Sequence, residues 1–443
     1  MNLISNFDSN YKKLEEFILV LFIIFSGFFV ALIYKINNFW SFYNLDEMLW
    51  YYRSDIFWSK ILNFDFSGLI QSAQPGITVY WFTGFMMKFI NFDFSAINDL
   101  IAKKNAEGFD FNYAINNHDM ATYKAYESIS FVFNIPLFLL LVGFFIIFYY
   151  LLKKLDFGRI VASFSLLFLT TNVYLQFWTT PSDKMLNIFM TLSFLTILVY
   201  LSGKGKKKYL IFSAIFGTLA VLSKISALFI LPFYFLMFVY YKWPLDKEKV
   251  KTILKESLTW ISIFIITSVL FLPTIIIHPE EVYNLVFKSN AIISNNPVAS
   301  DYIANTLFKY TNLSIAIITQ YLSHIFFLSL LAFLLIRYSK KYKDAFPALQ
   351  KKIINIIGYY IILFIIMVIV ISDNRDTRFM TPALIMLNVI AAIGLYEGVE
   401  IMTKKSMANK ELKNIFYILI FSLVILFQII FTVLDGVLMK ALW

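Results

Sequence analysis

Long apolar runs separated by short charged loops dominate the chain. An α-helix needs roughly 20 apolar residues to cross a hydrocarbon core about 30 Å thick, and runs near this length recur from end to end. The pattern predicts an all-α polytopic membrane protein of about eleven transmembrane helices. The predicted spans are residues 17–35, 128–152, 160–178, 185–201, 209–223, 225–241, 257–277, 314–336, 353–371, 380–400 and 415–434.

The stretch from Tyr209 to Tyr241 holds Lys224 near its middle. One helix of this length would be about 50 Å long and would place the lysine deep in the membrane, which costs roughly 2.5–3.5 kcal/mol on insertion scales. It would also reverse the side of every later loop. Two short helices with Lys224 at their turn avoid both penalties, so we expect two spans here.

Residues 36–127 form the one large loop between predicted spans. Within this loop, Glu47–Leu62 is rich in aromatic residues with interspersed charges, which suits a helix lying in the membrane interface. Ile77–Ile90 is apolar but too short to span, and Gln74-Pro75-Gly76 is a turn signal before it. We therefore expect a membrane module over residues 1–400, including this loop. Residues 401–443 are expected to hold a cytoplasmic loop and a last helix, without a separate soluble domain.

Basic residues sort to one side of this topology. With the N-terminus in the cytoplasm, the inner segments hold 24 Lys/Arg and 11 Asp/Glu, whereas the outer segments hold 13 and 17. The positive-inside rule favours this orientation. We expect a multi-pass protein of the plasma (inner) membrane with a cytoplasmic N-terminus. The large loop and the chemistry-bearing motifs described below would then face the extracytoplasmic side.

Composition narrows the class further. The chain is 60% hydrophobic and 15% charged, with a mean hydropathy of +0.72, so a soluble protein is excluded. The net charge of +10 is spread over short loops, which argues against nucleic-acid binding. Absence of cysteine excludes disulfides. The run Phe17–Tyr34 lacks a small-residue cleavage site after it, so it is predicted to be a retained anchor.

Asp46 and Glu47 follow the first predicted span. Two adjacent carboxylates at the membrane surface could supply a general base that removes a proton from an acceptor hydroxyl. The same pair would also suit a helix N-terminus, where acidic side chains cap the helix and favour its dipole. Both interpretations stay open on this pair alone.

Asp183 and Lys224 lie in two further outer turns. Asp183, in the turn Thr179–Lys184, could cap the following helix or contact a substrate. Lys224 is costly between two apolar helices unless it meets an anion, such as a phosphate, or snorkels to water.

Arg375 and Arg378 lie at the outer end of another span, against the inward bias of basic residues, and are suited to bidentate binding of a phosphate. His278 also lies outside, where it could be a phosphate or metal contact or a loop residue. Its spacing from His118 and His324 does not support a three-histidine metal site. The sequence therefore predicts no certain cofactor, and leaves a carboxylate-bound divalent metal ion open.

Together these motifs place carboxylates and phosphate-binding cations on one face of a membrane protein. This combination suits transfer from a lipid phosphate, with a base acting on the acceptor and cations stabilising the departing phosphate.

Five motifs, in order, resemble those of the GT-C glycosyltransferases, specifically the family of protein O-mannosyltransferases and lipid A aminoarabinose transferases. They are an acidic motif at Leu45–Glu47, a His/Lys-Pro-Pro-like element at Gln74–Trp81, a Pro-x-Asp turn at Pro181–Leu186, a Gly-Leu-Ala-x-Leu-Thr-Lys-like element at Gly217–Lys224, and an Arg-Tyr-x-x-Pro-like element at Arg378–Pro382.

The resemblance implies a GT-C-like bundle that transfers a sugar, with inversion, from a polyprenyl-phosphate donor to a hydroxyl of a lipid, glycan or protein acceptor. It implies Asp46 as the general base and Glu47 beside it in substrate binding. Asp183 would position a substrate, and Lys224 and Arg378 would hold the phosphate, with Arg375 as a second candidate.

Two positions depart from the family pattern. Gln74 stands where many relatives have a basic residue or histidine, and Phe379 replaces a tyrosine.

Other functions stay open on the sequence. A transferase of the same fold could move an oligosaccharide or another phospho-linked group. A transporter or flippase of lipid-linked sugars would usually show repeated halves and polar helices at the midplane, whereas these spans are apolar. A non-catalytic scaffold would not explain Asp46, Lys224 and Arg378 together.

Overall fold

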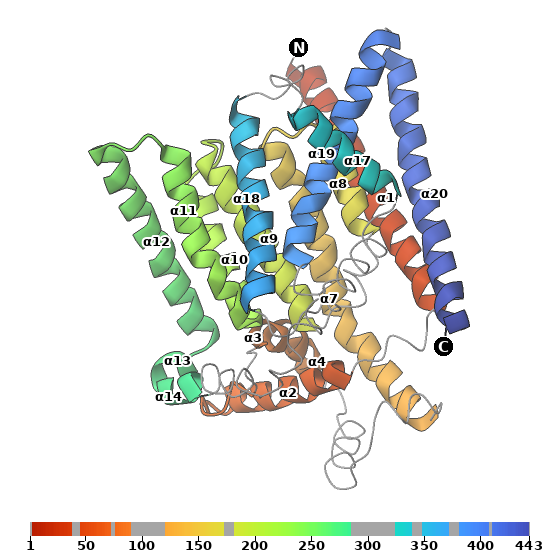
Figure 1. Cartoon of the computed structure of the whole chain (residues 1–443). Helices are drawn as coiled ribbons and strands as arrows, with labels where there is room; N and C mark the ends of the chain where they lie inside the picture. The colour runs from red at the N-terminus through yellow and green to blue at the C-terminus, as the bar shows by residue number, and fades with distance from the viewer. Residues whose placement is uncertain are drawn as a thin grey trace, which may run out of the picture. The chain divides into compact units, whose positions relative to one another are not determined.

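The computed structural model describes residues 2–37, 45–71, 76–89, 120–171, 181–284, 324–338, 348–371, 381–406 and 410–442. In these ranges the regular elements are helices and no strand occurs, which confirms the all-α prediction (Figure 1). The chain divides into two compact units. Unit 1 comprises Met1–Phe39, Val142–Trp178 and Phe308–Trp443, and unit 2 comprises Trp40–Leu141 and Thr179–Leu307.

Six helical stretches in the described ranges are long and apolar enough to cross a membrane: Tyr11–Ile33, Asn134–Lys154, Pro181–Leu201, Ile225–Lys242, Lys247–Phe271 and Thr381–Ile401. They support a membrane protein. The predicted count of eleven spans is not confirmed. Two of the predicted spans are short apolar helices in the described ranges, α8 (Arg159–Thr170) and α10 (Lys208–Ser223).

In unit 2, α9 (Pro181–Leu201) packs along α10, and α10 packs in turn along α12 (Lys247–Phe271). Neutral polar side chains join these helices. The Ser193 hydroxyl donates to the Ser213 carbonyl at 2.7 Å, and it accepts from Tyr234 at 2.9 Å. Trp260 Nε1 donates to Ser213 Oγ at 3.1 Å. Every group in this network is neutral and has a hydrogen-bond partner. The network therefore fixes the helix register without burying a charge or an unpaired polar group.

The apolar stretch around Lys224 is broken, as predicted. Helix α10 ends at Ser223, Lys224 has an extended backbone (φ −149°, ψ 131°), and a 3₁₀ turn, η4 (Ile225–Phe229), leads into α11 (Ile230–Lys242). The prediction of a single helix over residues 257–277 is wrong at its C-terminal end. Helix α12 stops at Phe271 because Pro273 has no N–H to continue the ladder and disfavours helical backbone at Leu272. Short helices α13 (Thr274–Ile277) and α14 (Pro279–Tyr283) follow.

A set of short helices covers one end of unit 2. Helix α2 (Leu45–Leu62) lies across this end, and α3 (Ile77–Val79), the π-helix η2 (Tyr80–Gly84) and α4 (Phe85–Phe89) lie between α2 and the bundle (Figure 1). We call these last three the α3–α4 segment. The predictions of a helix near Glu47–Leu62 and of a helix too short to span after Gly76 are both confirmed.

The two ends of unit 2 differ in charge. Helix α9 begins, and α10 and α12 end, where the α3–α4 segment packs; we call this the Lys224 end. The loop 202–207, between α9 and α10, lies at the opposite end and carries Lys204, Lys206 and Lys207. The separation of basic loops from the candidate residues therefore holds inside unit 2.

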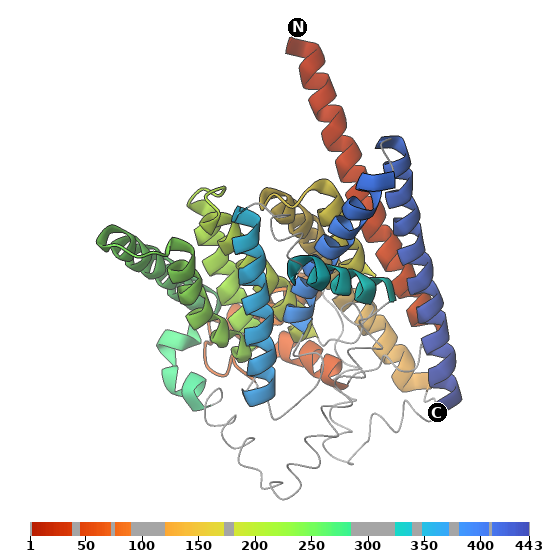
Figure 2. The ribbon, with the colours of Figure 1, turned by 45° about the horizontal axis from the view of Figure 1, so that its top comes forward.

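Unit 1 contains α1 (Asn2–Asn37), α8, α17 (His324–Tyr338), α18 (Ala348–Ile371), α19 (Thr381–Ser406) and α20 (Lys410–Leu442). Helix α7 (Met120–Lys154) begins in unit 2 and ends in unit 1. Figures 1 and 2 show α1 and α20 side by side. Glycine allows close approach elsewhere: a Cβ on Gly27 would overlap Thr170 of α8, and one on Gly394 would overlap the Ser329 carbonyl of α17.

Candidate functional site

Asp183 lies in the first turn of α9. The helix begins at Pro181, a residue whose fixed φ suits the first helical position. The carboxylate is therefore close to the positive end of the helix dipole. Its side chain is nevertheless only 1% exposed, and a buried carboxylate requires a charged or hydrogen-bonding partner.

Lys224 is one such partner. Its ammonium forms a hydrogen-bonded ion pair with Asp183 Oδ1, and the lysine side chain is 4% exposed. Lys224 follows the last residue of α10, where a cation is favoured by the negative end of the dipole. Two helix ends of opposite polarity thus hold two opposite charges. The sequence placed both residues at one end of the bundle but did not predict that they contact each other.

The position of Lys224 is fixed through its neighbour, Ser223. The Thr78 and Ser223 hydroxyl oxygens are 2.5 Å apart, and the Gly76 N–H donates to the Ser223 carbonyl at 3.2 Å. The Ser223 hydroxyl itself donates to the Leu219 carbonyl at 2.7 Å, so Thr78 must be the donor in the pair of hydroxyls. The α3–α4 segment is therefore bonded directly to the turn that carries Lys224.

Glycine is required at position 76. Its φ of 58° lies in the left-handed region, and a Cβ there would overlap the ring of Trp50. Trp50 also packs against Tyr80, with 5.7 Å between ring centroids. The turn signal in the sequence therefore marks a close approach between α2 and the start of α3.

The π-helix η2 holds the α3–α4 segment against three neighbouring helices, α2, α12 and α9. Trp58 of α2 donates from Nε1 to the Tyr80 carbonyl at 2.7 Å, and Trp81 donates from Nε1 to the Phe271 carbonyl at 2.8 Å. Phe271 is the last residue of α12, so Trp81 satisfies a carbonyl that the helix leaves without an internal partner. Phe82 contacts Phe189 of α9, with ring centroids 5.8 Å apart. π-Helical turns are frequent at functional sites.

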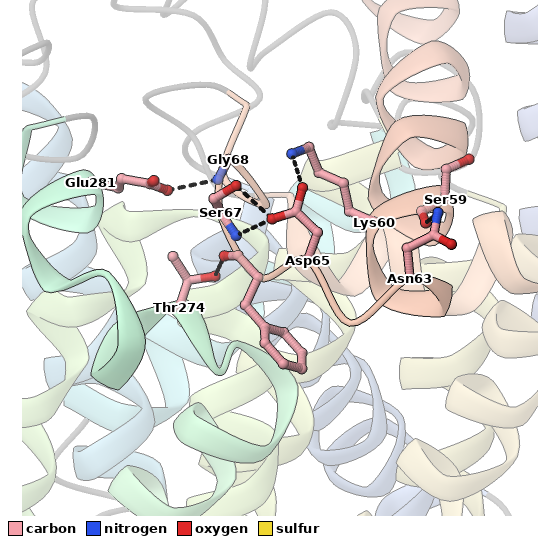
Figure 3. A network of polar contacts seen from close by, with 9 residues as sticks. Ser59, Lys60, Asn63, Asp65, Ser67, Gly68, Thr274 and Glu281 are labelled. Atoms are coloured by element: carbon pink, nitrogen blue, oxygen red, sulfur yellow. Dashed lines mark hydrogen bonds and ion pairs between the residues drawn. The ribbon is translucent and has the colours of Figure 1, made fainter.

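A polar network connects the residues after α2 with α13 and α14 (Figure 3). Asp65 accepts hydrogen bonds from Lys60 at 2.8 Å and from the Ser67 hydroxyl at 2.6 Å. These bonds, that of Lys60 foremost, hold the pKa of the Asp65 carboxyl well below its ordinary value. Thr274 donates to the Phe66 carbonyl at 2.9 Å, and the Gly68 N–H donates to Glu281 Oε2 at 2.7 Å (Figure 3).

His278 precedes α14 beside this network, at its N-cap position, and its side chain makes no capping hydrogen bond. It belongs to unit 2, as do Asp183 and Lys224, and no described contact joins it to that pair. A role in phosphate or metal binding stays a prediction.

The other predicted residues are placed in part or not at all. Asp46 and Glu47 lie in the first turn of α2, and their side chains are outside the described part of the structure. Gln74, Arg375 and Arg378 lie outside the described residues altogether. The structure therefore brings together Asp183 and Lys224, and leaves the grouping of the remaining residues as a prediction.

The described residues offer no group of three His, Asp or Glu side chains that could hold a metal ion. Asp183, the buried carboxylate of the candidate site, already faces an ammonium. Binding of a divalent metal ion, which the sequence left open, stays a prediction.

Sequence reasoning missed Thr78 and Ser223, which position the Lys224 turn, and a polar stripe on α9. Asp183, Asn187 and Thr191 are spaced four residues apart in a largely apolar helix. This spacing places them on one helix face, so periodicity of the polar positions could have revealed the stripe.

The fold defined by these helices is that of a GT-C-like membrane protein. The archaeal oligosaccharyltransferase AglB from Archaeoglobus fulgidus, solved in complex with an inhibitory peptide and a dolichol-phosphate, has a similar structure, with a TM-score of 0.51 and 13% sequence identity. The match covers 96% of this chain and 56% of AglB, so the chain spans little more than half the length of that protein. No family model and no curated protein sequence matches the chain. At this identity the likeness concerns the fold, and the narrower O-mannosyltransferase resemblance stays a prediction.

Proposed function

We propose that the protein is a membrane glycosyltransferase that transfers a sugar from a polyprenyl-phosphate donor to an acceptor hydroxyl, with inversion. The observation that carries the proposal is the buried Asp183–Lys224 ion pair at the Lys224 end of unit 2. Burying two charges costs desolvation free energy, so a buried ion pair at one end of a helix bundle suggests a function beyond stability. The GT-C-like fold, shared with a protein solved with a dolichol-phosphate, supports the same class of donor.

Lys224 has the chemistry needed for the phosphate. Its ammonium is a compact cation that binds phosphate as a point charge. A phosphate oxygen would compete with the Asp183 carboxylate for this cation. Arg375 and Arg378, which precede α19 in the sequence, would add bidentate contacts to the phosphate. Because the site is largely withdrawn from water, each of these interactions would be stronger than at an exposed surface.

The reaction requires a base and a stabilised leaving group. In our scheme, Asp46 removes the proton from the acceptor hydroxyl as its oxygen attacks the anomeric carbon, and Glu47 assists substrate binding. The new carbon–oxygen bond forms as the bond from that carbon to the phosphate oxygen breaks. The bonding electrons leave with the polyprenyl phosphate, whose growing charge Lys224 and the arginines stabilise. Attack opposite the leaving group inverts the anomeric centre.

Transfer of a preassembled oligosaccharide is the second candidate. The structural likeness to an oligosaccharyltransferase favours it, and the same base and cations would serve. The two candidates differ in the donor, so they are separated by the mass added to the acceptor.

The test uses purified full-length protein and a lipid extract from membranes of the source cells. We expect a lipid-linked sugar in this extract to raise the midpoint of thermal unfolding, Tm, by binding the folded state, and to be consumed when an acceptor is supplied. Mass spectrometry of the product identifies the transferred group. Asp46→Asn should abolish turnover and keep the donor-dependent rise in Tm. Wild-type turnover in this variant would refute the assignment of the base, and absence of any lipid-dependent shift in the wild type would refute the donor class.

A further inference from the structure

The polar stripe of α9 leads from Asp183 into the buried part of the helix. Asn187 and Thr191 follow Asp183 at intervals of one turn, so the stripe extends roughly 12 Å along the helix axis. Asn187 is 0% exposed and Thr191 is 1% exposed. All the surrounding positions from Met185 to Val199 are buried as well.

The amide of Asn187 is unusual in this setting. Neither its oxygen nor its nitrogen has a hydrogen-bond partner among the residues that the structure describes. Burying a polar group without a partner is unfavourable, and in a membrane protein such groups are normally paired across helices. Other polar side chains of the same helix are paired: Ser193, for example, bonds to Ser213.

Among the described residues, Thr191 likewise lacks the hydrogen bond that a helical threonine usually makes. Threonine in a helix usually donates to the carbonyl four residues earlier. Thr196 makes this bond to Leu192 at 2.6 Å, and Thr218 makes it to Ala214 at 3.0 Å. The hydroxyl of Thr191 has no such partner in the described part of the chain. Two successive polar positions on one face of α9 thus depart from the usual pairing, and this face begins at Asp183, the partner of Lys224.

The chemistry of the two side chains selects the kind of ligand. An amide and a hydroxyl each both donate and accept hydrogen bonds and carry no charge. A phosphate would accept only and would leave the Asn187 oxygen unpaired, whereas a metal ion would leave its N–H₂ unpaired. A hydroxyl group donates and accepts, so it can satisfy both side chains. Sugars present several such groups close together.

We propose that Asn187 and Thr191 bind hydroxyl groups of the transferred sugar, which makes α9 a sugar-binding helix with the phosphate subsite at its Asp183–Lys224 end. This inference rests on the proposed function and extends it: Lys224 would recognise the phosphate, and the α9 stripe would recognise the sugar. Neither residue takes part in bond making, so both are positioning and specificity residues.

The test compares two ligand preparations by their effect on Tm of the full-length protein. The first is the lipid-linked sugar fraction of a membrane extract. The second is the same fraction after mild acid hydrolysis, which releases the sugar and leaves the polyprenyl phosphate. We expect the intact fraction to give the larger rise in the wild type. In Asn187→Leu and Thr191→Val, the intact and hydrolysed fractions should raise Tm equally, by the amount that the hydrolysed fraction gives in the wild type.

Thr196→Val is the matched control, because it removes a buried hydroxyl of the same helix whose hydrogen bond is made within the helix. It should keep both responses. Without ligand, Asn187→Leu should unfold at the wild-type Tm or above, since the change removes an unpaired buried amide. A lower Tm would assign the amide a structural partner and overturn its role in binding.

The outcomes separate this inference from the proposed function. If Asn187→Leu and Thr191→Val keep the sugar-dependent difference, the α9 stripe is not a sugar site, whereas the phosphate assignment stands. If neither preparation stabilises the wild type, the proposed function and this inference both fail.

Discussion

The hydroxyl groups of Thr78 and Ser223 share a hydrogen bond although 145 residues separate them in the sequence. This bond holds the α3–α4 segment on the residue next to Lys224. A change in either hydroxyl should therefore act on the site as well as on the fold.

Thr78→Val removes the donor of this bond. We expect the free energy of unfolding to fall by about 1 kcal/mol, the usual contribution of one such bond. Turnover should fall by more than this loss of stability accounts for, because the Lys224 turn is released. Thr83→Val is the control, since the Thr83 hydroxyl bonds to Val79 within its own segment at 2.6 Å. Equal losses of turnover in the two variants would argue against a positioning role for Thr78.

Removing one member of the Asp183–Lys224 pair should be more harmful than removing both. Lys224→Met or Asp183→Asn alone leaves a buried residue without its partner, which typically costs about 3–5 kcal/mol. We expect the double variant to recover much of that loss, because no charge is then left buried. Thermal unfolding of the four proteins in detergent measures the coupling. Recovery of stability without recovery of turnover would assign the pair to function; strictly additive losses would show that the two side chains do not interact.

Gly76→Ala should destabilise the protein by more than about 1 kcal/mol, because position 76 has a positive φ and Trp50 occupies the space of the added methyl group. Gly143 of α7 offers a control of opposite sign. It lies in a helix with no atom within 4 Å of a built Cβ, so Gly143→Ala should stabilise by roughly 0.5–1 kcal/mol. Unfolding midpoints of both variants, measured under the same conditions, check the contrast.

Acid should loosen the network drawn in Figure 3 through Asp65. Because the pKa of this carboxyl is lower in the folded protein than in the unfolded chain, its contribution to stability is complete above the unfolded value of about 4 and declines as the pH falls further. Hydrogen exchange of the peptide that contains Ser67, corrected for the intrinsic effect of pH, should show this loss of protection. In Asp65→Asn the protection should be weaker at neutral pH and nearly independent of acid.

The two ends of unit 2 should lie on opposite sides of the membrane. The chain has no cysteine, so single cysteines report position without background. Phe64→Cys, at a side chain 81% exposed near the Lys224 end, should react with an impermeant maleimide in intact cells. Lys206→Cys, in the exposed loop at the other end, should react only after the membrane is opened. The reverse pattern would place the candidate site in the cytoplasm.

Local features of this protein were predictable from the sequence, and long-range pairings were not. The break at Lys224 followed from the penalty on a buried lysine, and the helix at α2 followed from its aromatic and charged pattern. The pairing of Asp183 with Lys224 depends on how α9 and α10 pack, which apolar runs of similar composition do not specify. The Tyr80 carbonyl of the π-helix accepts a hydrogen bond from Trp58, 22 residues earlier, and local sequence does not reveal this pairing. The end of α12 was misplaced because the apolar run continues through Pro273, where backbone chemistry outweighs hydropathy.

The bond from Trp81 to the carbonyl of Phe271 spans 190 residues. During synthesis, the α3–α4 segment leaves the ribosome long before α12 exists, so its bond to α12 can form only after several later helices have been made. Tyr80 and Trp81 of this segment pack against Trp50 and Trp58 of α2, so α2 gives the segment a local partner during that interval. Completion of the Lys224 end is thus a late event in biogenesis, and a chain that stops before α12 would insert most of its earlier helices and still lack a finished site.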